Sequence, residues 1–257
     1  MLRQLSHSNI EYLVTDGRKG YNWPFYTGCE HWRTGVCGGG GKDFNCWAKR
    51  MADRFNKGNF TPTLHPEKLL DPLHLKRPSK IAVCFTGDLF GDWVEPYGIV
   101  TPGGTWLKEA VFSKVKQYPQ HTFLFLTKAP WNLPKWGEFP DNAWVGLSAT
   151  NMSQIGDIPI LQDVQARVRF VSFEPMLDYT APDLRGIDWI ILGAATAPYR
   201  PPRIEWVNEI CEAANKAGVP VWLKNNLKPL FDKCARLSGI GYTLRQELPI
   251  AKTNNNL

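Results

Sequence analysis

The sequence lacks a long apolar run. No stretch approaches the roughly 18 apolar residues that a transmembrane helix requires. Its N-terminal segment, MLRQLSHSNIEYLVTDG, also lacks the apolar core of a secretory signal. We therefore expect a soluble, cytoplasmic protein that does not bind a membrane. Because thiols stay reduced in that compartment, we do not expect disulfides.

Cysteine is scarce, but its distribution is uneven. Six cysteines occur among 257 residues, and half of them are Cys29, Cys37 and Cys46. In a reducing compartment, clustered thiols are more often metal ligands than disulfide partners. Their spacing contains no close pair and is poor for a zinc knuckle, although His31 or His65 could complete a zinc site. Three thiols on one loop suit a 4Fe–4S cluster that leaves one iron open to a chelating ligand.

The other three cysteines lie in apolar surroundings. Cys84 falls inside the apolar run 81–86, and Cys211 and Cys234 follow helical apolar stripes, so we expect all three in the core. The four glycines Gly38–Gly41 lack the GK[ST] of a phosphate-binding loop. We interpret them as a spacer within the cysteine loop, residues 27–51.

Short apolar runs recur along the chain and alternate with helical patterns. Nearly continuous β-branched and aromatic runs are typical of parallel strands that are covered on both faces. The composition, 43% hydrophobic and 21% charged, is that of a globular protein. We predict one α/β domain over residues 1–257, built as a partial (open) TIM-type βα barrel with parallel strands and a frayed tail at about 250–257; a doubly wound open sheet is the alternative. The predicted strands are 21–26, 81–86, 122–127, 143–148, 168–172, 188–193 and 219–224, and the predicted helices include 105–118 and 203–218.

Polar residues follow the end of nearly every predicted strand. In folds of this class the active site lies at the carboxyl ends of the strands. Turns are exposed to solvent and are therefore often polar. A lysine, an aspartate and a glutamate at the ends of these strands are nevertheless more charged residues than turns alone require. We therefore predict a rim active site formed by Asp88, Lys128, Ser148, Ser172, Glu174 and Lys224.

Charge and aromatic content point toward an anionic partner. The net charge is +6 and the pI is near 9.0, which favours nucleic acid without requiring it. Aromatic side chains beside basic residues can stack the bases of single-stranded or extruded nucleic acid, although they also pack in cores. Nucleic acid is the leading substrate candidate, with a peptide or a small metabolite as alternatives. The tryptophans concerned are Trp23, Trp32, Trp47, Trp93, Trp106, Trp131 and Trp136.

A set of motifs occurs in a fixed order along most of the chain. They are YNWPFYTGC, NCWAKRMADRF, TPTLHPEKL, GDLFGD, HTFLFLTKAP, WVGLSAT, RFVSFEPML, DWIILGA and AGVPVWLK. As a set they resemble the phage Gp37/Gp68-like family, which is similar to a branch of the radical S-adenosylmethionine (SAM) superfamily. The resemblance covers roughly residues 20 to 226.

This resemblance implies a radical SAM enzyme. Cys29, Cys37 and Cys46 would bind the 4Fe–4S cluster, and SAM would be cleaved reductively so that hydrogen is abstracted from a substrate, possibly a nucleic acid that is modified or repaired. An electron donor such as flavodoxin or ferredoxin would serve as a partner. The positions that match the family's SAM and substrate pocket are Asp88, Lys128, Ser148, Ser172, Glu174 and Lys224.

Individual roles follow from the same resemblance. Lys128 or Lys224 would pair with the SAM carboxylate, and Asp88 or Glu174 would accept hydrogen bonds from its amino group or ribose. Cys84 could donate a hydrogen atom near a radical. Two features depart from the pattern: the last two loop cysteines lie further apart than in the family, and residues 193–196 read Gly-Ala-Ala-Thr where the family has a Gly-Gly-Glu-Ser type turn.

Two other classes of function remain open. One is a zinc-stabilised nucleic-acid-binding module without catalysis, which predicts colourless protein with about one zinc per chain. The other is a hydrolytic βα barrel that uses Asp88 and Glu174 as an acid–base pair. The hydrolase predicts activity that survives the loss of all three loop cysteines.

Overall fold

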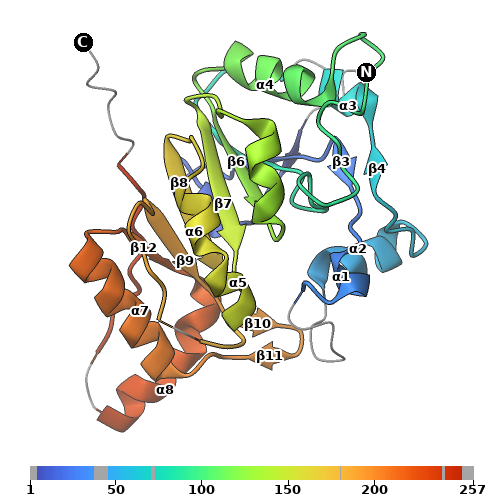
Figure 1. The fold of residues 1–257 in the computed structure, drawn as a ribbon. Helices are drawn as coiled ribbons and strands as arrows, with labels where there is room; N and C mark the ends of the chain where they lie inside the picture. The colour runs from blue at the N-terminus through green and yellow to red at the C-terminus, as the bar shows by residue number, and fades with distance from the viewer. Residues whose placement is uncertain (1–4, 38–45, 71–72, 180, 239–240, 251–257) are drawn as a thin grey trace, which may run out of the picture. The chain divides into compact units, whose positions relative to one another are not determined.

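The computed structural model describes residues 5–37, 46–70, 73–179, 181–238 and 241–250 (Figure 1). The fold is mixed α/β, with a mostly parallel sheet whose eight strands follow the order β1-β2-β5-β6-β7-β8-β9-β12. Contacts divide the chain into two compact units, residues 1–146 with 164–167, and residues 147–163 with 168–257. The glycine spacer at 38–41 and the tail at 251–257 lie outside the described residues.

The first unit contributes three parallel strands and an antiparallel edge. Strand β2 (Tyr21–Trp23) pairs in parallel with β5 (Lys80–Val83), and β5 pairs in parallel with β6 (Thr122–Thr127). Strand β1 (Ser6–His7) joins β2 in the antiparallel direction. Every residue of β5 is buried, in keeping with an apolar run that is covered on both faces.

Short helices and a second small sheet complete this unit. Strands β3 (Tyr26–Thr27) and β4 (Thr63–Leu64) pair antiparallel. Figure 1 shows α3 close to α4, and the two helices are in contact. The helices are α1 (His31–Thr34), α2 (Trp47–Phe55), α3 (Pro66–Leu70) and α4 (Leu107–Gln117), with 3₁₀ turns η1 (Glu11–Leu13) and η2 (Pro130–Trp136).

An aromatic cluster forms part of the core of the first unit. Phe90 meets the fully buried Trp136 edge-on with ring centroids 5.0 Å apart, and Phe112 of α4 lies 5.2 Å from Phe139. Burial of each such side chain contributes about 2–3 kcal/mol. The buried positions of α4 (Leu107, Val111, Phe112 and Val115) share one face, which explains why its amphipathic pattern was readable from the sequence.

The second unit contributes a parallel three-strand segment. Strand β8 (Val168–Phe173) pairs with β9 (Trp189–Leu192), and β9 pairs with β12 (Val221–Leu223). Its helices are α5 (Met152–Gly156), α6 (Ile158–Gln162), α7 (Ile204–Ala217) and α8 (Lys228–Ser238), with a 3₁₀ turn η3 (Asn225–Leu227) and a small pair of strands, β10 (Ala195–Thr196) and β11 (Tyr199–Arg200). Strand β7 (Ala143–Ser148) begins in the first unit and ends in the second.

The predicted α/β class with parallel strands is confirmed, and two details differ. The run 81–86 was predicted as one strand, but β5 ends at Val83 because Cys84 adopts a left-handed backbone with φ +56°. The run 21–26 divides between β2 and β3. The strand pairs of the described residues do not show closure into a barrel. None of the described helices is long and apolar enough to span a membrane.

Candidate functional site

Two similar turns bring Cys29 and Asp88 together in the first unit. Thr27-Gly28-Cys29 begins at the last residue of β3, and Thr86-Gly87-Asp88 follows β5. Gly28 and Gly87 form a parallel β-bridge, and the Gly28 amide donates to the Thr86 carbonyl at 3.2 Å. A Cβ atom on Gly87 would lie 2.6 Å from the Gly28 carbonyl oxygen, so this close approach requires glycine.

Asp88 is a buried carboxylate whose two oxygens are both engaged. The Thr127 hydroxyl donates to them at 2.8 and 3.0 Å, and the backbone amides of Phe90 and Lys128 donate at 3.0 and 2.9 Å. The ring Nε2 of buried His31 lies 3.2 Å from Oδ2. Because buried charge is tolerated only when it is well hydrogen-bonded, this network fixes the position of the carboxylate.

The surroundings of the cysteine loop raise the pKa values of two of its thiols, Cys29 and Cys37. Burial raises the pKa of the Cys29 thiol, and the negative charges of Asp88, Cys37 and Cys46 raise it further. Burial also raises the pKa of Cys37 to about 11, with Cys46 and Asp88 adding to the effect and the Lys128 ammonium opposing it. Both thiols are therefore protonated at neutral pH, and a metal that bound them would release protons.

The chemistry of this donor set fits an iron–sulfur cluster. All six cysteines are free thiols, so no disulfide removes a loop cysteine from the set. Cys46 is the N-cap residue of α2, where the helix dipole favours negative charge. In the described geometry no three histidine, cysteine, aspartate or glutamate side chains converge closely enough to hold a metal ion. The segment that joins Cys37 to Cys46 lies outside the described residues, and the donors on either side of it are thiols, the ligands that clusters use.

A fourth thiol lies close to this group. Cys84 is fully buried, as predicted, and its Sγ donates weakly to the Trp23 carbonyl at 3.7 Å. Burial raises its pKa. The pKa of Tyr26 is raised to about 12 by burial and, to a smaller extent, by the charges of Cys84 and Cys29. The other two cysteines, predicted as core residues on α7 and α8, are only half-buried, since both helices turn those positions partly toward solvent.

The second unit gathers a different set of the predicted residues. Glu174 follows β8 and forms an ion pair with Lys224, which follows β12, and both side chains are largely shielded from solvent. A Cβ atom on Gly193 would lie 3.1 Å from both side chains, so this glycine leaves room for the pair. Ser148 and Ser172, at the ends of β7 and β8, are buried. The structure thus groups Asp88 with Lys128 in one unit and Glu174 with Lys224 in the other.

Three side chains near these sets were not predicted to contact the site residues, and His31 was considered only as a possible zinc ligand. His31 and Thr127 both contact Asp88, as described above. The side chain of Asn226 forms two hydrogen bonds with the backbone of Ala194: it donates to the carbonyl at 2.9 Å and accepts from the amide at 3.0 Å. The only available signal was position: His31 stands two residues after Cys29, and the other two stand at strand ends.

The tryptophans divide into two groups. Trp23 and Trp136 are fully buried, which is a core role rather than a stacking one. Trp32 and Trp47 are 42% and 47% exposed on α1 and α2, within the cysteine loop. The cations of Arg33 and Lys49 lie 5.5 and 5.3 Å from the Trp32 ring centroid. Exposed aromatics with adjacent cations are suited to base stacking.

Comparison with known proteins gives one family. Searches against curated proteins and against solved structures find no match. A family model described as DUF5131, a protein family of unknown function, matches residues 8–231, which include the cysteine loop, both residue groups and all the parallel strands. The chain belongs to the DUF5131 family.

Proposed function

We propose that this protein is a radical SAM-type enzyme in which Cys29, Cys37 and Cys46 bind a 4Fe–4S cluster. The observation that carries the proposal is the bridge between Gly28 and Gly87, which joins the Cys29 turn to the turn of the buried, hydrogen-bonded carboxylate of Asp88. The resemblance to the phage Gp37/Gp68-like family supports it as well. On this proposal the parallel sheet is a partial βα barrel, and the enzyme acts in the cytoplasm with a flavodoxin or ferredoxin as electron donor.

The residues of the first unit would hold the cofactor and control charge around it. When bound, the cluster supplies one-electron reduction of SAM, which yields methionine and a 5′-deoxyadenosyl radical. Thiols that bound the cluster would have to lose their protons, and the Lys128 ammonium, which lowers the pKa of Cys37, would offset part of the added negative charge. Asp88 keeps both oxygens engaged by Thr127, Phe90, Lys128 and His31, and it therefore positions the Cys29 turn.

The second unit provides the Glu174–Lys224 ion pair and a backbone turn at Ala194 that Asn226 holds in place by hydrogen bonds. The carboxylate of Glu174 can accept from an amino or hydroxyl group while Lys224 neutralises its charge. Lys224 is equally able to donate to a carboxylate. Because Asn226 fixes the backbone at Ala194, the turn that replaces the family's Gly-Gly-Glu-Ser segment is held without a charged side chain. These groups are suited to binding and orienting a zwitterionic ligand such as SAM.

The substrate we propose is a nucleic acid. The support is the pair of exposed tryptophans within the cysteine loop, Trp32 and Trp47, with the cations of Arg33 and Lys49 over the ring of Trp32. Such a surface can bind an unpaired base and the phosphates that flank it. The positive net charge acts in the same direction.

The test is formation of 5′-deoxyadenosine. Protein reconstituted without oxygen is mixed with SAM and dithionite, with and without added DNA, RNA or cell extract, and the products are separated by chromatography. Wild type and Cys234→Ala should form 5′-deoxyadenosine, whereas Cys29→Ala should give only the background of SAM alone. If wild type forms none under any of these conditions although its cluster is reducible, the enzymatic proposal is wrong.

A further inference from the structure

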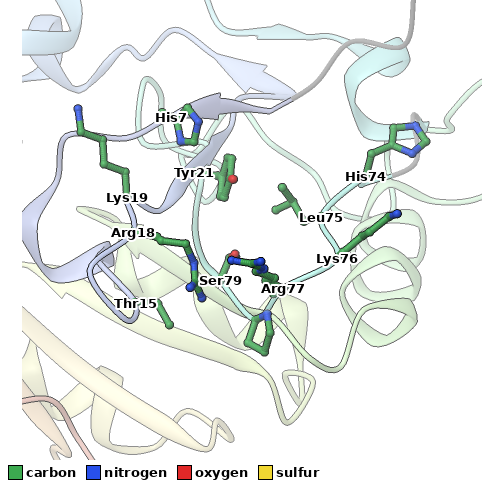
Figure 2. Close-up of a pocket in the computed structure, with 11 residues that line it drawn as sticks. His7, Thr15, Arg18, Lys19, Tyr21, His74, Leu75, Lys76, Arg77 and Ser79 are labelled. Atoms are coloured by element: carbon green, nitrogen blue, oxygen red, sulfur yellow. The ribbon is translucent and has the colours of Figure 1, made fainter.

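The first unit contains a hollow of about 590 Å³ whose lining residues are separate from the cysteine loop (Figure 2). It lies at the start of two adjacent parallel strands. Residues 15–21 lead into β2 and residues 74–79 lead into β5, and His7 of the edge strand β1 also lines the hollow. The chain reaches Cys29 after β2 and β3, and Asp88 after β5, so the hollow lies at the opposite, amino-terminal end of β2 and β5. Its volume falls within the range of about 300–1,000 Å³ that is usual for small-molecule sites.

Four permanent cations line this hollow. They are Arg18, Lys19, Lys76 and Arg77, and none of the described residues that line it is acidic. They come from two segments that are far apart in the sequence, so the fold brings the charges together. In Figure 2 the side chains of Arg18 and Arg77 extend toward the centre beside Ser79, whereas Lys19 points away. Concentrated positive charge at the wall of a cavity favours an anion.

Two of these cations, Arg18 and Arg77, are available to a ligand (Figure 2). Arg18 pairs at 3.2 Å with Asp16, but the two side chains are 44% and 76% exposed, and an ion pair so exposed to water is worth little. Lys19 donates to the amide oxygen of Asn9 at 2.7 Å, a neutral partner. Arg77 forms no ion pair with a described residue. Since guanidinium groups bind phosphate through two parallel hydrogen bonds, Arg18 and Arg77 are suited to a phosphate oxyanion.

An aromatic pair stands beside the cations. His7 and Tyr21 are directly opposite each other on β1 and β2, and their rings stack with centroids 4.7 Å apart and an angle of 29° between planes. Tyr21 is half-buried and His7 is exposed, so the pair presents ring surface at the hollow. Each base stacked on an aromatic side chain typically adds about 1–3 kcal/mol to nucleic-acid binding.

We propose that this hollow binds a phosphorylated nucleoside, with the phosphate on Arg18 and Arg77 and the base against Tyr21. The ligand is either a free nucleotide or one unit of a single-stranded nucleic acid, since both present the same chemistry. The inference goes beyond the iron–sulfur proposal and does not rest on it, because none of the residues involved belongs to the cysteine loop.

The test measures binding of two probes. A fluorescein-labelled thymidine decamer is followed by anisotropy, and thymidine 5′-monophosphate by calorimetry. Arg18→Gln combined with Arg77→Gln should weaken binding by about tenfold or more, the cost of one to two charge-assisted hydrogen bonds. For the decamer, the slope of log K against log salt should fall by about 0.7, as expected when the contact to one phosphate of a single strand is lost.

A matched double variant separates this site from general charge. Arg185→Gln combined with Arg236→Gln also removes two positive charges, but from exposed positions of the second unit, and it should leave binding unchanged. Equal weakening by both double variants would overturn the proposal, as would failure of both probes to bind. Tyr21→Leu should weaken the nucleotide but not inorganic phosphate, and equal affinity of the wild type for both would refute the role of the base.

Two comparisons complete the design. Binding of the decamer alone identifies a nucleic-acid strand as the source of the phosphate, and equal binding of the mononucleotide identifies a free nucleotide. Cys29→Ala should bind both probes as the wild type does. Failure of the iron–sulfur proposal therefore leaves this result intact, and failure of nucleotide binding leaves SAM cleavage open.

Discussion

Asp88 illustrates how one buried side chain connects the sheet to the cysteine loop. Its carboxylate, 4% exposed, receives donors from the residues after β6 and from its own turn, and it touches His31 of α1. An amide at this position would turn an NH₂ group toward at least one of those donors. A buried donor that faces another donor loses its hydrogen bond and is not compensated by water.

Asp88→Asn should therefore destabilise the fold by about 2–3 kcal/mol, a loss measurable by urea unfolding. The control is Asp183→Asn, which changes a solvent-exposed carboxylate that pairs with Arg185 and should leave the unfolding midpoint unchanged. An Asp88→Asn protein that unfolds at the wild-type midpoint would show that the network does not hold the loop.

Lys80 is a second buried charge, with different consequences. Only 8% of its surface is exposed, and its ammonium donates to the Val14 carbonyl at 2.8 Å. Burial lowers its pKa from 10.5 to about 8, and the charge of Asp16 opposes the shift. Between these pH values the unfolded chain keeps the proton that the folded chain has released. Stability contributed by this residue must therefore rise as pH rises through that window.

Lys80→Met removes this dependence. The stability difference between wild type and Lys80→Met should shift in favour of wild type between pH 8 and 10.5, by at most about 3 kcal/mol. Buried thiols with raised pKa values act in the opposite direction, but they are shared by both proteins and cancel in the difference. The measurement is urea unfolding at several pH values, and a difference that does not change with pH would contradict the assignment.

At the scale of elements, the cysteine loop depends on the close approach of two turns. Gly28 has φ +82°, and a Cβ atom there would lie 2.2 Å from the Thr61 carbonyl oxygen. Gly104 has a similar φ of +77°, but nothing lies within 4 Å of a Cβ atom at that position. The two glycines therefore share the same backbone strain and differ only in the space around them.

Gly28→Ala should cost about 3–5 kcal/mol, the sum of left-handed strain and a clash with rigid backbone, whereas Gly104→Ala should cost only about 1–2 kcal/mol from strain. Thermal or urea unfolding of both variants provides the comparison. Equal losses in the two proteins would show that the turn at Gly28 can move away from residues 60–61.

The elements that sequence patterns predicted well are those with a continuous apolar run or a clear helical face. Strands β6 and β7 match their predicted bounds, and α7 ends at Gly218 in the left-handed conformation expected of a helix cap. The end of β5 was missed because nothing in the run IAVCFT marks Cys84 as left-handed. The strands β1, β3 and β4 are two residues long and depend on partners distant in sequence, which local patterns do not reveal.

At the scale of the whole molecule, the predicted site residues divide between the two compact units. Asp88 and Lys128 lie with the cysteine loop in the first, and Ser148, Ser172, Glu174 and Lys224 lie in the second. Their places at strand ends were predictable from the alternation of apolar runs and turns. The basic hollow was not, because its two segments, 15–21 and 74–79, carry no catalytic motif and become neighbours only through the pairing of β2 with β5.

The central claim is that the three loop thiols hold an iron–sulfur cluster, and metal analysis tests it most directly. Protein purified without oxygen should be brown and contain about four irons and four sulfides per chain. Cys46→Ala should lose most of that iron, and Cys234→Ala, which removes a thiol of α8 outside the loop, should retain it. Stoichiometric zinc without sulfide in the wild-type protein, or unchanged iron in Cys46→Ala, would contradict the account.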